Sequence, residues 1–147
     1  MNTNVEFLNY IHQNAQMGKD TVKQLIDISN DEQFKNMLKS QHNEYVSVFD
    51  KTNTLLEQFN KKAKGTNVLS KVTFYLIVNM QTLTNKTASH LSEMLIQGST
   101  MGIIQITKKI SEYNTANTQI LDLANQLLNI EQKNVDECKK FLGSFVK

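Results

Sequence analysis

The phrase Gln-x-x-x-Met-Gly occurs twice in this chain, at residues 13–18 and 97–102. Both copies lie in segments whose apolar residues recur every three or four positions, a period typical of a helix that buries one face. In the first segment the residues that share this face are Leu8, Ile11, Ala15, Gly18, Val22 and Leu25. The equivalent residues of the second segment are Leu95, Ser99, Gly102 and Ile106. Because the glycine lies on the apolar stripe in both copies, the repeat predicts two helix pairs of similar plan.

The whole sequence predicts four long helices, at about residues 4–28, 31–60, 86–112 and 115–145. Proline is absent and glycine numbers only five, so nothing in the composition interrupts long helices. The second helix has a heptad seam made of Phe34, Leu38, Gln41, Tyr45, Val48, Thr52, Leu55 and Phe59. The fourth helix has a similar seam, made of Leu121, Ala124, Leu128, Glu131, Val135, Cys138, Leu142 and Phe145.

Residues 68–85 carry one more apolar stripe, which the repeat does not explain. This segment is long enough to return the chain along a bundle of helices of about 30 residues each. We therefore expect an all-α four-helix bundle with a long crossover between the second and third helices, forming one domain over residues 1–147. Two alternatives stay open for residues 68–85: a separate helix, or the start of a longer third helix.

Lysine supplies all 16 basic residues, and the net charge is +2. The absence of arginine disfavours recognition of phosphates or guanine, for which the guanidinium fork is the usual group. The uncharged stretch at residues 72–85 is shorter than the roughly 20 residues that span a membrane, and the polar first residues do not resemble a signal peptide. A single cysteine, Cys138, fits a reducing compartment. We therefore expect a cytoplasmic protein with no nucleic-acid or membrane partner.

The bundle pattern and the phrase MLIQGSTMG at residues 94–102 resemble the ferritin-like superfamily, in particular small bacterial four-helix bundles with few metal ligands. The resemblance covers nearly the whole chain and implies a ferritin-like bundle. In metal-binding members, the first and third helices each supply an inward Glu, and the second and fourth each supply Glu-x-x-His. Together these side chains hold a pair of iron or manganese ions.

This chain departs from that ligand pattern almost everywhere. The matching positions read Gln41-x-x-Glu44 on the second helix and Glu131-x-x-Asn134 on the fourth, and no central inward residue of the first or third helix is a glutamate. The three histidines are expected to lie off the apolar stripes; they are His12, His42 and His90. Two carboxylates without an imidazole make a poor ligand set, so we expect no bound metal and no cofactor.

A polar layer inside the predicted core occupies these positions. Asn14, Gln41 and Glu131 are expected in the core, with Glu44 and Asn134 one turn away at its edge. A buried carboxylate is costly unless it is paired or protonated, so Glu131 is expected to hydrogen-bond Gln41 or Asn14. We favour a layer that fixes the register of the helices. The alternative is a relic or weak metal site.

Two further patterns concern the first and third helices. Small residues are expected to let their backbones approach closely, at Ala15, Gly18, Gly98, Ser99 and Gly102. A second face is rich in methionine, a side chain that adapts to irregular partners, and it includes Met17, Met94, Met101 and Ile104. The crossover is expected to cover part of this face, and a homodimer contact would cover the rest.

The sequence contains no glycine-rich phosphate loop and no Ser/His/Asp or Cys/His set that would converge in such a bundle. We therefore expect no catalytic residues, and a non-enzymatic structural or protein-interaction bundle. The competing interpretation is a ferritin-like metalloprotein with a degenerate site that uses Glu44 and Glu131. A third is a bundle that holds a small apolar ligand beside Gly98 and Gly102.

Overall fold

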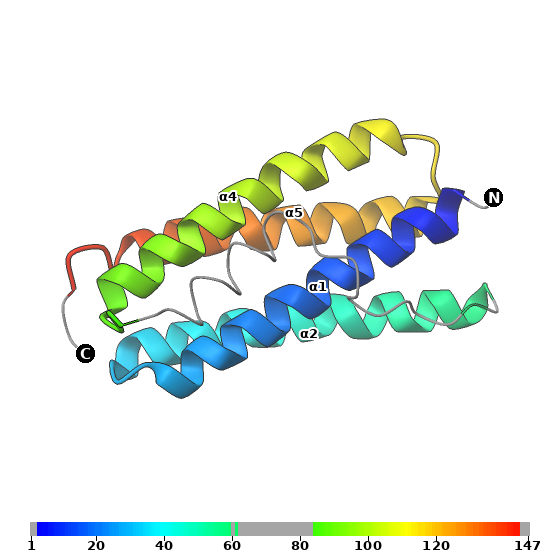
Figure 1. Ribbon diagram of the computed structural model, residues 1–147. Helices are drawn as coiled ribbons and strands as arrows, with labels where there is room; N and C mark the ends of the chain where they lie inside the picture. The colour runs from blue at the N-terminus through cyan, green and yellow to red at the C-terminus, as the bar shows by residue number, and fades with distance from the viewer. Residues whose placement is uncertain (1–2, 60, 62–83, 145–147) are drawn as a thin grey trace.

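The computed structural model describes residues 3–59, 61 and 84–144 (Figure 1). This part of the chain contains four helices and no strand: α1 (Thr3–Ile28), α2 (Glu32–Gln58), α4 (Ala88–Glu112) and α5 (Thr118–Lys139). The prediction of an all-α structure with four long helices is therefore confirmed. None of these helices is both long and apolar enough to cross a membrane.

α4 begins with its own N-cap and is not a continuation of a helix in the preceding segment. Thr87 caps the helix, because its side chain accepts a hydrogen bond from the backbone N of His90 (3.2 Å) that would otherwise have no partner in the first turn. Residues 84–87 are not helical. The third helix therefore does not extend back through residues 68–85 as one continuous element. The predicted crossover otherwise falls on residues 62–83, which lie outside the described residues.

The helices pair in antiparallel fashion. α1 runs antiparallel to α2, and α4 runs antiparallel to α5, whereas α4 begins at the end of the bundle opposite to the one where α2 ends (Figure 1). α2 and α5 also run antiparallel to each other. The rings of Phe34 and Phe141 lie 5.2 Å apart near one end, and Lys51 Nζ lies 3.3 Å from Gln126 Oε1 further along. The α2–α5 contact thus joins the two helix pairs.

Contacts between distant segments close both ends of the bundle. At one end, Phe7 of α1 stacks on Tyr113, which follows α4, with ring centroids 4.9 Å apart. At the other end, the backbone N of Ser89 donates to the backbone O of Ser144 (2.8 Å). The Ser144 hydroxyl in turn donates to the Asp31 carboxylate (3.4 Å). These contacts tie α1 and α2 to α4 and α5.

The buried face of α2 matches its predicted seam. Its buried residues are Phe34, Leu38, Gln41, Tyr45, Val48, Thr52, Leu55 and Leu56. Phe59, the last predicted seam residue, follows the helix and packs against the core while only partly buried. The heptad pattern therefore located the core-facing side of α2 correctly.

The buried face of α5 differs from its predicted seam. Its buried residues are Ile120, Leu123, Ala124, Leu127, Ile130, Asn134 and Cys138. The helix ends at Lys139 and is followed by a turn with Gly143 at φ 89°, so Leu142 is 48% exposed and the predicted end near residue 145 is wrong. The seam prediction fails because α5 packs against α1, α2 and α4. Its buried stripe is therefore wide and is not centred on one heptad line.

Candidate functional site

A polar cluster joins α2 to α5 in the interior of the bundle. The Tyr45 hydroxyl donates a hydrogen bond to Glu131 Oε1 (2.7 Å). Asn134, one turn further along α5, donates from Nδ2 to the Tyr45 hydroxyl oxygen (3.2 Å). Tyr45 and Asn134 are buried, whereas Glu131 is partly buried. The three side chains form one connected set of hydrogen bonds, which we call the relay.

The two glycines of the repeated phrase lie beside this relay. A Cβ atom on Gly18 would lie 2.4 Å from the Tyr45 ring, and one on Gly102 would lie 3.6 Å from the Glu131 carboxyl carbon. Each glycine therefore faces a side chain from the helix paired with its own: α2 for Gly18, α5 for Gly102. We expected these small residues to let the first and third helices approach each other. In the structure they give room to the Tyr45 ring and to the Glu131 carboxyl group.

The surroundings of Glu131 favour its neutral form. Burial raises its pKa from 4.5 to about 7, and hydrogen bonds from Tyr45 and Ser99 lower the pKa by a smaller amount. Burial also raises the pKa of Tyr45 well above 10, and the Glu131 charge raises it further. At neutral pH, Glu131 therefore exists in both protonation states, while Tyr45 keeps its proton.

The predicted partners of Glu131 lie elsewhere. Gln41 is buried, and its Nε2 lies 3.4 Å from Glu137 Oε1 and 3.9 Å from Cys138 Sγ. In the antiparallel α2–α5 pair, Gln41 therefore lies about two turns along α5 from Glu131. Asn14 donates from Nδ2 to the backbone O of Tyr10 (2.8 Å) in its own helix. The residues of the predicted polar layer therefore have separate partners and do not form one layer. Glu131 bonds Tyr45, which we predicted only as a buried residue of the α2 seam.

The edge positions of the layer differ from the prediction in part. Asn134 is 2% exposed and belongs to the interior. Glu44 faces solvent and forms an ion pair with Lys133 of α5. Glu44 and Glu131 therefore have different partners on different sides of the α2–α5 contact. Among the described residues, no group of three or more His, Cys, Asp or Glu side chains gathers as a metal site would require.

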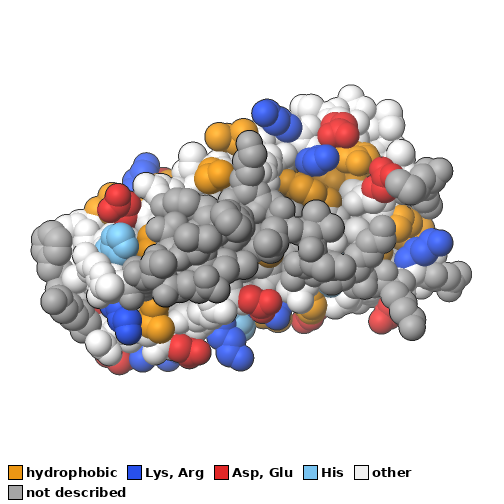
Figure 2. Space-filling view, viewed as in Figure 1, with side chains coloured by type: hydrophobic (Ala, Val, Ile, Leu, Met, Phe, Trp, Pro, Cys, Tyr) orange, Lys and Arg blue, Asp and Glu red, His pale blue; other side chains and the backbone are white. Residues whose placement is uncertain are grey.

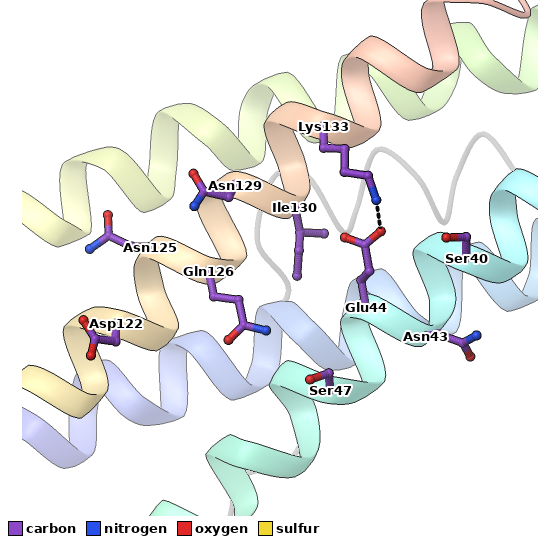
Figure 3. A pocket seen from close by; sticks show the side chains of 10 residues that line it. All are labelled: Ser40, Asn43, Glu44, Ser47, Asp122, Asn125, Gln126, Asn129, Ile130 and Lys133. Atoms are coloured by element: carbon purple, nitrogen blue, oxygen red, sulfur yellow. Dashed lines mark hydrogen bonds and ion pairs between the residues drawn. The ribbon is translucent and has the colours of Figure 1, made fainter.

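A groove of about 660 Å³ follows the solvent-exposed side of the α2–α5 contact, and the Glu44–Lys133 pair spans it (Figure 3). Its lining is polar except for Ile130, and comprises Ser40, Asn43, Glu44, Ser47, Asp122, Asn125, Gln126, Asn129 and Lys133. A second hollow of about 420 Å³ shares Asp122 and Gln126 with the groove and extends it along the helices. The amide and hydroxyl groups of this lining offer both hydrogen-bond donors and acceptors.

The region beside Gly98 has little free volume. A hollow of about 40 Å³ lies between α1 and α4, with Gly18, Gly98 and Ser99 among its lining residues. This is close to the roughly 30 Å³ that one water occupies, and far below the roughly 150 Å³ of an engineered cavity that binds benzene. The hollow does not fit the small apolar ligand of the third interpretation.

His12 does not lie where its position relative to the apolar stripe predicts. It is 3% exposed and stacks on Phe49 of α2, with ring centroids 4.5 Å apart. Burial lowers its pKa. The buried face of α1 also includes Phe7 and Asn9, so it is wider than the stripe and reaches His12. His42 and His90 are partly buried.

The four residues of the predicted interface are unevenly exposed. Met94 is 2% exposed and therefore part of the core, whereas Ile104 is 51% exposed. Met17 and Met101 lie between these extremes. On the side of the molecule shown in Figure 2, exposed apolar side chains form several small groups among charged and other polar ones. A homodimer through this face stays a prediction.

The sequence analysis did not predict that Tyr45, Ser99 and Gly102 together surround the Glu131 side chain. A signal was available, since a buried tyrosine needs a partner for its hydroxyl and the glycine of each repeated phrase makes room for a large side chain. The structure shows four helices in the part of the chain that it describes, and ferritin-like ancestry stays an expectation from the sequence. No family model, curated protein or solved structure matches this chain.

Proposed function

We propose that this chain is a non-enzymatic helical bundle that serves as a structural or protein-interaction module. We further propose a ferritin-like arrangement, in which the chain between α2 and α4 crosses from one end of the bundle to the other. The observation that carries the structural role is the relay. Tyr45 bonds both Glu131 and Asn134, so these three side chains connect α2 to α5 through polar contacts in the interior.

Such a relay is suited to fixing how the helices align. Sliding α5 by one turn along α2 would break the hydrogen bond between the Tyr45 hydroxyl and Glu131, and losing a polar partner in the interior is costly. The Tyr45 ring also needs the space that the missing Cβ of Gly18 provides. A polar group that specifies one register at some cost in stability has precedents in coiled coils.

The test is to replace the whole relay by apolar side chains, with Tyr45→Phe, Glu131→Leu and Asn134→Leu in one protein. All partners change together, so no polar group of the relay is left unpaired. We expect the variant to keep its helical content and to melt no lower than the parent, but to show several sets of NMR signals or an altered solution mass. A single set of signals at the parent mass would refute the register role.

Metal analysis of protein purified without a chelator tests the competing metalloprotein. We expect no stoichiometric iron, manganese or zinc, because Glu44 pairs with Lys133 and Glu131 bonds Tyr45. Near-stoichiometric metal in the parent that is lost in Glu131→Ala would overturn the proposal. Glu32→Ala is the matched control, since it removes a 78% exposed carboxylate that belongs to neither position of the supposed metal site.

We also propose a cytoplasmic location, no nucleic-acid or membrane partner, and self-association as a homodimer. The support for the dimer is the exposed apolar side chain of Ile104 next to the partly buried Met101. We expect light scattering to give the mass of a dimer, and Ile104→Glu to reduce it to that of a monomer. A monomer mass over a broad range of concentrations in the parent would remove the dimer.

A further inference from the structure

The hydrogen bonds of the relay have a direction, because the Tyr45 hydroxyl has a single hydrogen to donate. Asn134 Nδ2 donates to Tyr45 (3.2 Å), and Tyr45 donates to Glu131 Oε1 (2.7 Å). In the part of the chain that the structure describes, Asn134 Oδ1 is buried and has no donor. In this direction the charged Glu131 carboxylate receives a hydrogen bond at one end of the relay. The Asn134 oxygen at the other end has no donor among the described residues.

Once Glu131 is protonated, it no longer requires the Tyr45 hydroxyl to donate to it. A protonated carboxyl group is itself a donor, so the Tyr45 oxygen can accept from Glu131 and turn its own hydrogen toward Asn134. A half-turn of the Asn134 amide exchanges Nδ2 and Oδ1, two atoms of nearly the same size. In the reversed relay the Asn134 oxygen accepts from Tyr45, and Nδ2 takes the place that Oδ1 held. One atom of the buried amide is then unpaired in either direction, so the protonation of Glu131 decides between the two directions.

We propose that the Asn134–Tyr45–Glu131 relay is a proton-operated switch, whose hydrogen bonds point toward Glu131 when it is charged and toward Asn134 when it is protonated. Glu131 takes up one proton from solvent, and apart from that O–H bond only hydrogen bonds are exchanged. Because the relay joins α2 to α5, the contact between these helices responds to pH. This property goes beyond the proposed structural role and does not require it.

The groups around Glu131 set the pH range of the switch. The titratable ones are Tyr10 of α1, Tyr45 of α2 and Cys138 of α5. Ser99 and Gly102 of α4 contribute no charge. No lysine forms an ion pair with Glu131 among the described residues. Burial is therefore the largest influence on Glu131, and it raises the pKa to about 7.

The test follows two NMR signals of the full, isotope-labelled protein across a pH series with a chelator present. The first is the carboxyl carbon of Glu131, which reports its protonation. The second is the side-chain amide of Asn134, which reports whether its N–H group or its oxygen bonds Tyr45. We expect both signals to titrate with one midpoint, near pH 7 rather than 4.5. A constant Asn134 signal during the titration of Glu131, or a Glu131 midpoint near 4.5, would overturn the switch.

Variants show whether Tyr45 carries the coupling. In Tyr45→Phe we expect Glu131 to titrate still, with the Asn134 signal no longer following it. In Glu131→Gln we expect the transition to disappear from the Asn134 signal. Glu44→Gln is the matched control, because Glu44 is a glutamate at the groove that bonds Lys133, and we expect it to leave both titrations unchanged. An Asn134 transition that persists in Glu131→Gln would refute the proposal even if Tyr45→Phe fails to fold.

Discussion

Gly18 and Gly102 hold equivalent positions in the repeated phrase but have different surroundings in the folded protein. The position of a Cβ on Gly18 falls 2.4 Å from an aromatic ring carbon of Tyr45, a distance that real Cβ atoms do not reach. The position of a Cβ on Gly102 lies 3.6 Å from Glu131, an ordinary van der Waals contact. The α1–α2 pair therefore needs its glycine, whereas the α4–α5 pair tolerates a larger residue there.

The difference shows that one sequence signal can have two physical causes. Between α1 and α2, the glycine makes room for a rigid ring that is 3% exposed and has little freedom to move away. Between α4 and α5, the facing group is the carboxyl end of a flexible side chain. The repeated glycine thus identified equivalent positions in the two helix pairs. It did not indicate how much the stability of each pair depends on having glycine there.

The largest effect is expected from alanine at the two glycines. Overpacking a core costs about 1–3 kcal/mol, and alanine in place of glycine inside a helix gains about 1 kcal/mol. So close an approach to a ring carbon places Gly18→Ala at the upper end of that cost, about 3 kcal/mol. After the gain we therefore expect Gly18→Ala to lower the free energy of unfolding by about 2 kcal/mol, and Gly102→Ala to raise it by up to about 1 kcal/mol. Urea denaturation of the two variants measures this difference of about 3 kcal/mol.

A second substitution sharpens this comparison. The close atoms of Tyr45 are ring carbons, so Tyr45→Leu should recover part of the loss in a Gly18→Ala background while Tyr45→Phe should not. Neither change at Tyr45 should produce such a recovery in a Gly102→Ala background. Equal losses for the two alanine variants would show that the glycines are equivalent after all, and would break the comparison.

The next largest effect is a dependence of stability on pH, which comes from Glu131, the residue that faces Gly102 in the α4–α5 pair. The folded pKa of Glu131, about 7, lies above the ordinary glutamate value of 4.5 that applies to the unfolded chain. The folded state therefore holds the proton more tightly than the unfolded state, and the stabilisation is fully present below 4.5 and lost as pH rises to about 7. At about 1.4 kcal/mol per pKa unit, we expect a loss of about 2 kcal/mol, allowing for partial exposure of the side chain.

Glu131→Gln isolates this contribution. The lowered pKa of His12 acts in the opposite direction, because a buried neutral histidine destabilises the fold as pH falls below its unfolded pKa of about 6.5. Subtracting the pH profile of Glu131→Gln from that of the parent removes the contribution of His12 and of surface groups. A difference that is flat across the neutral range would mean that Glu131 titrates alike in both states.

The fold was predictable from the sequence where the buried residues of a helix follow one heptad line. The heptad of α2 identified its buried residues from Phe34 to Leu55. The heptad of α5 failed in its middle because a helix with three neighbours buries a wider stripe, which brings Asn134 inside. It failed at its end because the helix stops at Lys139, which leaves Leu142 exposed. His12 was missed because the buried face of α1 is wider than its apolar stripe. Periodicity locates a face, but its width depends on tertiary packing.

The candidate site was predictable only in part. The position of Glu131 in the heptad seam predicted a carboxylate at the edge of the core that needs a hydrogen-bond donor. The donor itself did not, because the choice between Gln41 and Tyr45 depends on the α2–α5 register, which periodicity leaves open. The structure sets that register with Tyr45 opposite Glu131 and Gln41 opposite Cys138.

A smaller effect is expected when the donor is removed. Tyr45→Phe keeps the ring beside Gly18 and deletes the hydroxyl that bonds Glu131, so it separates the packing of the α1–α2 pair from the polar contact with α5. We expect a loss of about 1–2 kcal/mol above pH 7, where an unpaired carboxylate is charged, and a smaller loss below it. The pKa of Glu131 should rise, because the bond from Tyr45 lowers it. An unchanged pKa would show that the hydroxyl does not stabilise the charged form.

The smallest effect is expected at the solvent-exposed side of the α2–α5 contact. Glu44 and Lys133 pair across the groove, with side chains 25% and 51% exposed respectively. Water and salt screen such a pair, so removing it by Glu44→Gln or Lys133→Gln should cost less than about 1 kcal/mol, and the cost should fall further at high salt. The double variant should cost no more than about the sum of the two single ones, because an exposed group left alone is hydrated. Denaturation of the four proteins of this cycle measures the coupling. A coupling above about 2 kcal/mol would mean that the outer pair, like the relay beneath it, helps to hold α2 and α5 in register.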